Sequence, residues 1–324
     1  MTIPGVTLAS AEALAPAETP LQQVWRAFRK DRLAMVGLAA LIALIVLALL
    51  GKLLTEWWVV FDPTTVRLPD KLLPPLSAPT SAIASALRPP LGTYPFGTDE
   101  LGRNVFARML QGSFVSLSVG IVAVSISLGI GIAVGGLAGY YGQRKLGPIS
   151  VDSLLMRFTD VVLCFPTFFL ILTVVALLPP SIYNIMIVIG ITSWMGTARF
   201  VRAEFMALRE QDFVTAAKAL GLPEWRIIFR HMVPNAMAPV LVSATIDVAY
   251  AILTESALSF LGFGVRPPYA TWGNILADGR NYIFDAPWLF VIPGSAILVV
   301  VLAFNLVGEG LRDAMNPKLR KRAS

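Results

Sequence analysis

Long apolar runs, nearly free of charged residues, alternate with polar segments along this chain. A helix of about 20 apolar residues crosses the hydrocarbon core of a bilayer, so most runs suit one span and the longest suits two. Pro179 and Pro180 divide that longest run. The pattern therefore predicts an all-α integral membrane protein with six transmembrane helices. The runs are 33–51, 109–143, 161–198, 232–264 and 286–308.

The composition agrees with this pattern. Apolar residues make up 56% of the chain and charged residues 14%, against roughly 25% charged residues in soluble domains. With six spans, four polar segments share one side of the membrane and hold 4, 3, 6 and 5 basic residues, 18 of the 26 in the chain. Basic residues favour the cytoplasmic side, so we expect both termini and the segment 204–235 in the cytoplasm. This topology accounts for the net charge of +6 without a nucleic-acid partner.

The polar segment 204–235 lies between two apolar runs and has the signals of a helical hairpin. Asp212 is expected to N-cap a short helix over Phe213–Leu220. Gly221 suits the left-handed position that ends such a helix, and Pro223 suits the first turn of the next one. The spacing then predicts an amphipathic helix parallel to the membrane surface, whose apolar face carries Trp225, Ile228, Phe229 and Met232.

This segment resembles the coupling loop of ABC-importer permeases, in which Glu-Ala-Ala is followed by Gly after three residues and by Ile-x-Leu-Pro after nine more. Ala216, Ala217, Gly221 and Pro234 keep that spacing. Thr215, His231 and Val233 stand where the pattern has Glu, Ile and Leu. The resemblance implies a hairpin that docks on a separate ATPase, and an ordinary interfacial hairpin is the alternative. The residues expected to carry the coupling are Asp212, Thr215, Ala216, Ala217, Gly221 and Arg226.

Two further motifs narrow the resemblance. The run PFGTDELGR precedes the second span and the run ESALSFLGFG ends the fifth. The first is similar to the segment before the second span in oligopeptide and dipeptide permeases of the second, C-type subunit class, and the second is similar to a segment of the peptide/nickel permease branch. In the first motif we expect Thr98 to N-cap a helix with Asp99 and Glu100 in its first turn. The alternative is a capped interfacial helix without a contact role.

Spans two and three carry signals for their own packing. Gly131, Gly135 and Gly139 recur every four residues, which lets another helix approach closely. Pro166 is expected to kink the third span.

Two acids interrupt the fifth span, and an ionised acid at membrane depth usually faces protein or water. Asp247 and Glu255 are eight residues apart, about 12 Å along a helix, and on nearly the same side of it. They are candidates for lining a translocation path, where a peptide ammonium group would be attracted. A structural role beside polar groups of neighbouring helices is the alternative, and the sequence favours it for Glu255.

The sequence lacks the signals of an enzyme. It has no GxxxxGK[ST] phosphate-binding run, no CxxC pair and no HExxH, and it has one His and one Cys, Cys164. We therefore expect no catalytic residues, no bound metal and no cofactor in this chain. ATP and Mg would be bound by partner subunits.

The resemblance implies the permease subunit of an ATP-driven ABC importer in the bacterial inner membrane, with dipeptides or oligopeptides as substrates. Its expected partners are a homologous second permease, two ATP-binding subunits, an extracytoplasmic substrate-binding protein and membrane lipid. The alternatives are a nickel, glutathione or sugar-oligomer importer, a proton-coupled secondary transporter and a membrane-embedded enzyme. The expected parts are a cytoplasmic tail 1–32, a first transmembrane helix 33–54, an extracytoplasmic loop 55–113, a five-helix core 114–309 that includes the coupling loop 204–235, and a basic cytoplasmic tail 310–324.

Overall fold

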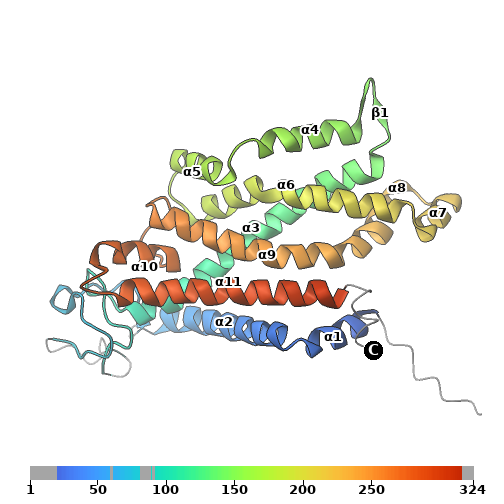
Figure 1. Ribbon diagram of the computed structural model, residues 1–324. Coiled ribbons are helices and arrows are strands. Elements are labelled where there is room, and N and C mark those ends of the chain that lie inside the picture. The colour runs from blue at the N-terminus through green and yellow to red at the C-terminus, as the bar shows by residue number, and fades with distance from the viewer. Residues whose placement is uncertain (1–19, 59–60, 81–88, 90–91, 316–324) are drawn as a thin grey trace, which may run out of the picture.

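The computed structural model describes residues 20–58, 61–80, 89 and 92–315. Its long helices lie side by side in one bundle (Figure 1). One end carries α10 (Trp272–Gly279) and is called the α10 end; the opposite end carries α7 (Asp212–Ala219) and is called the α7 end. Residues 1–19 of the cytoplasmic tail expected over 1–32 lie outside the described residues, as do residues 316–324 of the basic tail.

Five described helical stretches are long and apolar enough to cross a membrane, and a bent helix pair supplies a sixth span. The prediction of six spans is therefore confirmed when the bent pair counts as one. The spans are α2 (Arg32–Trp57), α3 (Val105–Tyr141), the bent pair of α4 (Val151–Leu163) and α5 (Thr167–Leu177), α6 (Ile182–Arg209), the stretch Glu224–Phe260 that ends in α9 (Val233–Phe260), and α11 (Trp288–Met315).

The remaining elements are short. α1 (Pro20–Lys30) lies within the segment expected as a tail and packs on α11 through Phe28, which is buried beside Gly310. A small hairpin of β1 (Lys145–Leu146) and β2 (Ile149–Ser150) joins α3 to α4. The others are α8 (Glu224–Arg226), a π-helical segment (Ile227–Met232) and two 3-10 turns (Leu68–Asp70 and Arg280–Tyr282).

Several helices extend beyond the apolar runs that predict them. α3 begins at Val105, inside the segment 55–113 assigned to a loop, and α11 ends at Met315, inside the segment 310–324 assigned to a tail. α4 begins at Val151, before the run at 161–198. Apolar composition marks only the part of a helix that suits the bilayer core, and polar turns continue the helix on either side.

The third span is broken at the position of Pro166. α4 ends at Leu163, α5 starts at Thr167, and the two helices meet at a bend of 78°. The sequence predicts a kink at this proline, and the structure has a complete break into two helices. Proline removes one backbone donor and clashes with the preceding turn, which accounts for the position of the break.

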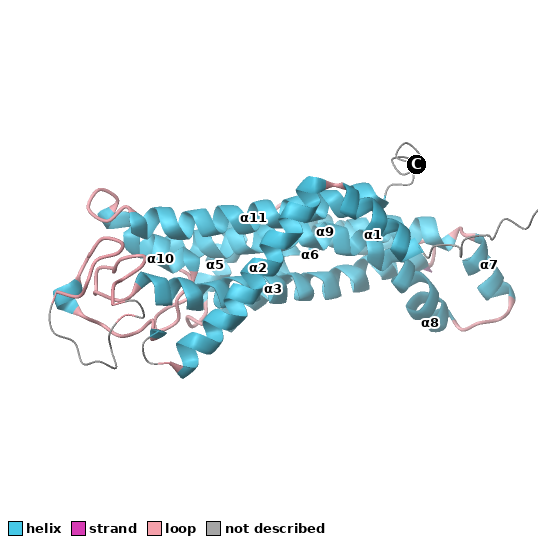
Figure 2. Ribbon diagram, turned by 90° about the horizontal axis from the view of Figure 1, so that it is seen from below, coloured by secondary structure: helices cyan, strands magenta, loops and turns pink. Residues whose placement is uncertain are grey.

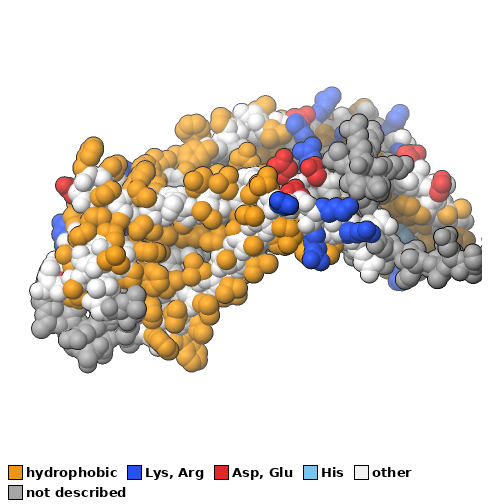
Figure 3. All heavy atoms as spheres, turned by 60° about the horizontal axis from the view of Figure 1, so that its bottom comes forward, with side chains coloured by type: hydrophobic (Ala, Val, Ile, Leu, Met, Phe, Trp, Pro, Cys, Tyr) orange, Lys and Arg blue, Asp and Glu red, His pale blue; other side chains and the backbone are white. Residues whose placement is uncertain are grey.

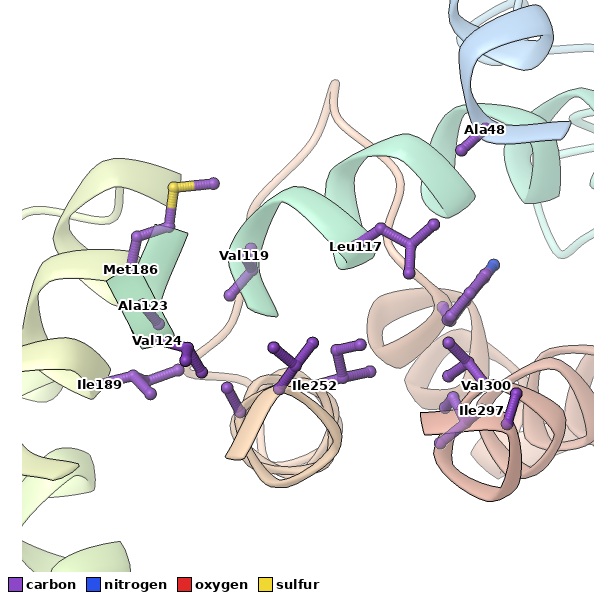
Figure 4. Close-up of a cluster of buried hydrophobic side chains, with 14 of the residues drawn as sticks. Ala48, Leu117, Val119, Ala123, Val124, Met186, Ile189, Ile252, Ile297 and Val300 are labelled. Carbon is purple, nitrogen blue, oxygen red and sulfur yellow. The ribbon is translucent and has the colours of Figure 1, made fainter. Parts of the chain in front are cut away.

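The glycine row of α3 forms a close contact with α6, as the sequence predicts. A Cβ atom on Gly135 would lie 2.3 Å from the carbonyl oxygen of Ala198, and one on Gly139 would lie 2.5 Å from Cβ of Phe205. Figure 4 shows the core beside this contact, where Val124 of α3 faces Ile189 of α6 and Ile252 of α9 points toward α3. The helices α3, α6 and α9 therefore form the centre of the bundle.

The surface of the bundle divides along its length. Figure 3 shows charged side chains gathered toward the α7 end, while apolar side chains cover most of the middle. Many of the exposed apolar side chains belong to α2, including Leu49, Leu50 and Leu53. An apolar surface of this kind suits contact with lipid.

Candidate functional site

The helix α7 lies at the tip of the bundle, beyond the ends of the long helices (Figure 2). It begins at Asp212, and Gln211 occupies the N-cap position without a side-chain cap. The prediction that Asp212 caps this helix is therefore wrong by one residue. Its carboxylate lies in the first turn, where the helix dipole favours an acid. Thr215 donates its hydroxyl to the carbonyl of Gln211, four residues earlier, at 3.3 Å.

Gly221 ends α7 in the left-handed conformation that the sequence predicts, with φ of 70°. Its amide donates to the carbonyl of Lys218 at 3.0 Å, and the amide of Leu222 donates to the carbonyl of Ala217 at 3.2 Å. These two bonds form the usual glycine-dependent helix end and reverse the chain direction. Pro223 directly precedes α8 and does not lie in its first turn.

The predicted apolar face of the next helix is only half right. Met232 is buried and Ile228 is half-buried, as predicted, whereas Trp225 and Phe229 are exposed by 60% and 68% and Ile227 is buried instead. The cause is the π-helical segment, which inserts one residue into the turn so that side chains five apart share a face. The helix also continues directly into α9 and does not lie apart from it.

The hairpin of α7, α8 and the π-helical segment has a buried and an exposed side. Val214 and Ala217 of α7 pack into a buried cluster with Phe205 of α6, Met232 and Val240. That cluster also contains Tyr140 of α3. α7 is therefore packed directly against side chains of α3, α6 and α9.

The exposed side of the hairpin carries small and large apolar side chains beside polar ones such as Asp212 and Lys218. Ala216 is exposed, although its neighbour Ala217 is buried. The guanidinium of Arg226 lies over the ring of Trp225, with 5.4 Å to its centroid. The hairpin also exposes four large apolar side chains, which are Phe213, Leu220, Trp225 and Phe229. Contiguous exposed apolar groups of this kind mark contacts with another protein or a membrane.

The two acids of α9 lie in different surroundings. Asp247 lines a cavity of about 80 Å³ between α3, α6 and α9, together with Ser127, Ser193 and Tyr250. Glu255 is fully buried, and one of its carboxyl oxygens accepts a hydrogen bond from Ser259 at 2.6 Å. Its other oxygen has no hydrogen-bond partner within the described residues. The two acids thus share a helix but line no common cavity.

The surroundings of Glu255 are formed by the start of α10. A Cβ atom on Gly273 would lie 2.7 Å from Cα of Ser256 and 2.8 Å from Cβ of Ser259. The amide of Trp272 donates to the hydroxyl of Ser116 on α3. Glu255 therefore lies at a tight junction of helices, which agrees with the structural role that the sequence favours for it.

The motif before α3 forms a buried ionic cluster, not the helix cap predicted from Thr98. The helix starts at Val105, and the side chain of Asn104 caps it by accepting from the amide of Phe106. Thr98 is buried and accepts from the amide of Leu73 at 2.8 Å. Asp99 accepts hydrogen bonds from the side chains of Arg103 and Arg108, so its carboxylate does not cap the helix.

One carboxyl oxygen of Asp99 accepts from Nε of Arg103 at 2.7 Å and from Nη1 of Arg108 at 2.6 Å. Asp278 of α10 accepts from Nη2 of Arg103 at 3.1 Å and forms an ion pair with Nη1 of Arg108 at 2.8 Å. The four groups join the loop before α3 to α10. The sequence shows Asp99 and Arg103 close together, but nothing in its spacing indicates that Asp278 completes the cluster.

Two family models match the chain. The model described as "Binding-protein-dependent transport system inner membrane component" matches residues 131–321. The model described as "N-terminal TM domain of oligopeptide transport permease C" matches residues 19–75. Together they cover the first span, the hairpin and the helices from α4 onward, and they leave residues 76–130, which include most of α3, unmatched.

Curated relatives match nearly the whole chain. The dipeptide transport system permease protein DppC of Alkalihalophilus pseudofirmus is 38% identical over 304 residues, 94% of this chain and 92% of that protein. The oligopeptide transport system permease protein OppC of Bacillus subtilis is 35% identical, over 91% of this chain and 88% of that protein. Among solved structures, an inward-facing MetNI methionine ABC transporter aligns with a TM-score of 0.49 and 18% identity over 65% of this chain and 98% of that one.

Proposed function

Because this chain belongs to the family of binding-protein-dependent transport system inner membrane components, we propose that it is a permease subunit that imports dipeptides or oligopeptides. Two observations support the substrate class. Two relatives that align with more than nine tenths of this chain are named as dipeptide and oligopeptide transport permeases. The chain also matches the N-terminal model of oligopeptide permease C. Nickel, glutathione and sugar oligomers are the alternative substrates.

The proposed assembly contains a homologous second permease, two ATP-binding subunits and an external substrate-binding protein. ATP and Mg would be bound by the ATP-binding subunits, and this chain would hydrolyse nothing itself. The single observation that carries the proposal is the hairpin. Its exposed side carries Ala216 with both apolar and polar neighbours, whereas Val214 and Ala217 on its other side pack into the bundle.

The mechanism follows from that two-sided packing. When the ATP-binding subunits close, they would move α7 through contacts with Phe213, Ala216 and Leu220, which are exposed. Gly221 and its two hydrogen bonds hold the angle between α7 and the next helix. The buried cluster would pass the movement to α3, α6 and α9, and the shared path would switch from inward-facing to outward-facing. Asp212, Thr215 and Arg226 belong to the same hairpin surface.

The proposed orientation places the α7 end and both termini in the cytoplasm. It rests on the distribution of basic residues, which favours the cytoplasmic side. Ala219 of α7 and Ala78 of the loop before α3 are both exposed. In intact cells, an impermeant thiol reagent should label an Ala78→Cys variant and not an Ala219→Cys variant, both built on Cys164→Ser. Labelling of Ala219→Cys from outside would reverse the orientation.

The test of function is uptake by the purified complex in liposomes. Labelled dipeptide should accumulate only with ATP, Mg and the binding protein present. A proton-coupled secondary transporter would accumulate it with a proton gradient and without ATP, and that result would overturn the proposal. Accumulation of nickel, glutathione or sugar oligomers in place of peptide would retain the importer and replace its substrate.

A further inference from the structure

Two cavities lie one after the other along α6 and α9, and this stretch of the two helices is called the groove. The cavity of about 80 Å³ is lined by Ser193 of α6 and Asp247 of α9, among others. A larger cavity of about 580 Å³ lies nearer the α7 end and contains Phe200 and Glu204 of α6, with Ser243 of α9. The same two helices thus line both cavities in order.

The side of α9 that faces this groove is polar, although the helix lies within an apolar span. Ser243, Asp247, Tyr250 and Thr254 follow one another at spacings of four, three and four residues, so they lie on one face. None of the four is fully buried, and Tyr250 is 66% exposed. A polar face at membrane depth is expensive against lipid, so it indicates contact with water, a solute or another protein.

The charges in the groove are not neutralised by ion pairs. Within the described residues, no ion pair involves Asp247, Glu204 or Arg312, although Glu204 and Arg312 line the same larger cavity. The larger cavity therefore presents one charge of each sign, and the smaller one presents a single acid. The groove as a whole attracts a cationic group most strongly beside Asp247.

We propose that this groove is the wall of the substrate path and that the Asp247 carboxylate binds the free α-ammonium group of a passing peptide. The proposal rests on the proposed function, which it deepens by naming the recognised group. Ser193 and Tyr250 border the same cavity and can accept hydrogen bonds from an ammonium group. Glu255 takes no part, because it is buried beneath α10.

The length of the groove determines whether a peptide reaches both cavities at once. Ser193 and Glu204 are eleven residues apart on one helix, which corresponds to about 16 Å. An extended dipeptide spans only about 7 Å. A dipeptide would therefore occupy the two cavities in succession. At the second cavity its ammonium and carboxylate groups would meet Glu204 and Arg312, which match a zwitterion in charge.

Charged thiol reagents test the groove without knowledge of the binding protein. In the reconstituted complex with Cys164→Ser, a Ser243→Cys variant is treated with a cationic and an anionic methanethiosulfonate of equal size. The ratio of their rates is divided by the ratio for a free thiol in solution. The cationic reagent should be favoured about tenfold, because Asp247 lies one helical turn away.

The preference should fall to nearly one when Asp247→Asn is added and should return with Asp247→Glu. The matched control is Glu309→Gln, because Glu309 is an exposed acid of α11 that lines neither cavity. A preference that Asp247→Asn leaves unchanged would overturn the proposal. Absence of modification by either reagent would overturn it as well, since the groove would then contain no water.

A second measurement separates this proposal from the proposed function. Free dipeptide should slow the cationic reagent at Ser243→Cys several-fold more than the N-acetylated dipeptide at equal concentration. Equal protection by both peptides would show that Asp247 does not recognise the ammonium group. Failure of the wild-type complex to import any peptide would instead refute the proposed function, whatever the reagents show.

Discussion

The two ends of this molecule differ in whether their side chains find partners within the chain. At the α10 end, the buried acids Asp70 and Asp99 accept hydrogen bonds from arginine side chains of the same chain. At the α7 end, Trp225 and Phe229 are largely exposed, and within the described residues no cluster of the chain covers them. The chain thus pairs its buried charges internally at the α10 end and leaves large apolar side chains exposed at the α7 end.

Because of this difference, substitutions at the two ends should affect different properties, the stability of the subunit at one end and its binding to a partner at the other. A buried charge that loses its partner destabilises the chain wherever it lies, because desolvation is no longer compensated. An exposed apolar side chain contributes little to the isolated chain and much to a complex that buries it. Substitutions at the α10 end should therefore change the stability of the subunit, and substitutions on the exposed side of the hairpin should change its binding.

The largest effect is expected for Asp99→Ala. The change leaves Arg103 and Arg108, both nearly buried, with only Asp278 as a shared acid. Removal of one partner from a buried ionic cluster costs about 3–5 kcal/mol. Thermal unfolding of the purified subunit in detergent should show the loss. Its neighbour Glu100 is partly exposed and makes none of the ion pairs described for this cluster, so Glu100→Ala is the control. Equal unfolding temperatures for the two variants would refute the role of the cluster.

The pair Ala216→Glu and Ala217→Glu compares the two sides of α7. Ala217 is 5% exposed, so a larger charged side chain there overpacks the core by about 1–3 kcal/mol and buries a charge. We expect Ala217→Glu to unfold the hairpin while the six spans stay inserted, which faster proteolysis between Arg209 and Arg230 would show.

Ala216 is exposed, so Ala216→Glu should leave the proteolysis rate unchanged and still reduce the amount of ATP-binding subunit that copurifies. Substrate-stimulated hydrolysis and uptake should fall together in both variants. If Ala216→Glu retains full binding and coupled uptake, the hairpin is not the docking element.

A smaller effect is expected for Gly221→Val. The left-handed backbone at φ of 70° costs a residue with a side chain about 1–2 kcal/mol. No atom lies within 4 Å of an added Cβ, so the cost comes from the backbone alone. Gly221→Asn should retain most coupled uptake, because Asn tolerates this conformation better. A loss as large for Asn as for Val would indicate a contact and not a conformational requirement.

The smallest effect concerns acid sensitivity at the α10 end. Burial alone would raise the pKa of the Asp70 carboxyl. Hydrogen bonds from Thr80, Arg67 and Tyr94 outweigh this effect and lower the pKa to about 2. An aspartate in the unfolded chain has a pKa of about 3.9. The stability that Asp70 contributes is therefore complete above about pH 4 and is lost as the pH falls through about 2.

Amide exchange at Thr80, whose amide donates to Asp70 at 2.8 Å, should report this loss. After correction for the intrinsic rate, protection should decrease between about pH 4 and pH 2 in the wild type. In Asp70→Asn the protection should be lower at neutral pH and should not depend on pH in this window. Constant protection of the wild type down to pH 2 would contradict the assignment.

The sequence by itself determined the features that depend on local chemistry. Apolar runs fixed the number of spans, because a bilayer core demands about 20 apolar residues whatever lies beside them. Gly221 and the row that includes Gly135 were identifiable because glycine alone permits a left-handed backbone or a very close helix contact. The position of the break at Pro166 follows from the same kind of local rule.

Only the tertiary structure decided which side of each element is used. The π-helical segment shifts the face of the chain after Pro223, so a regular period of 3.6 residues selected the exposed Phe229 and missed the buried Ile227. Asp99 does not cap the helix that it precedes because Arg103 and Arg108 hold its carboxylate, and Asp278 pairs with the same two arginines. Asp278 is 175 residues from Arg103 in the chain, and a contact over that distance leaves no mark in local spacing.

The same reason separates Asp247 from Glu255. Their spacing places them on nearly the same side of one helix, and local periodicity can say nothing more. The packing of α10 over Glu255 and the opening between α6 and α9 beside Asp247 distinguish a buried structural acid from an accessible one. Such differences depend on neighbours that are distant in sequence, and therefore on the folded chain as a whole.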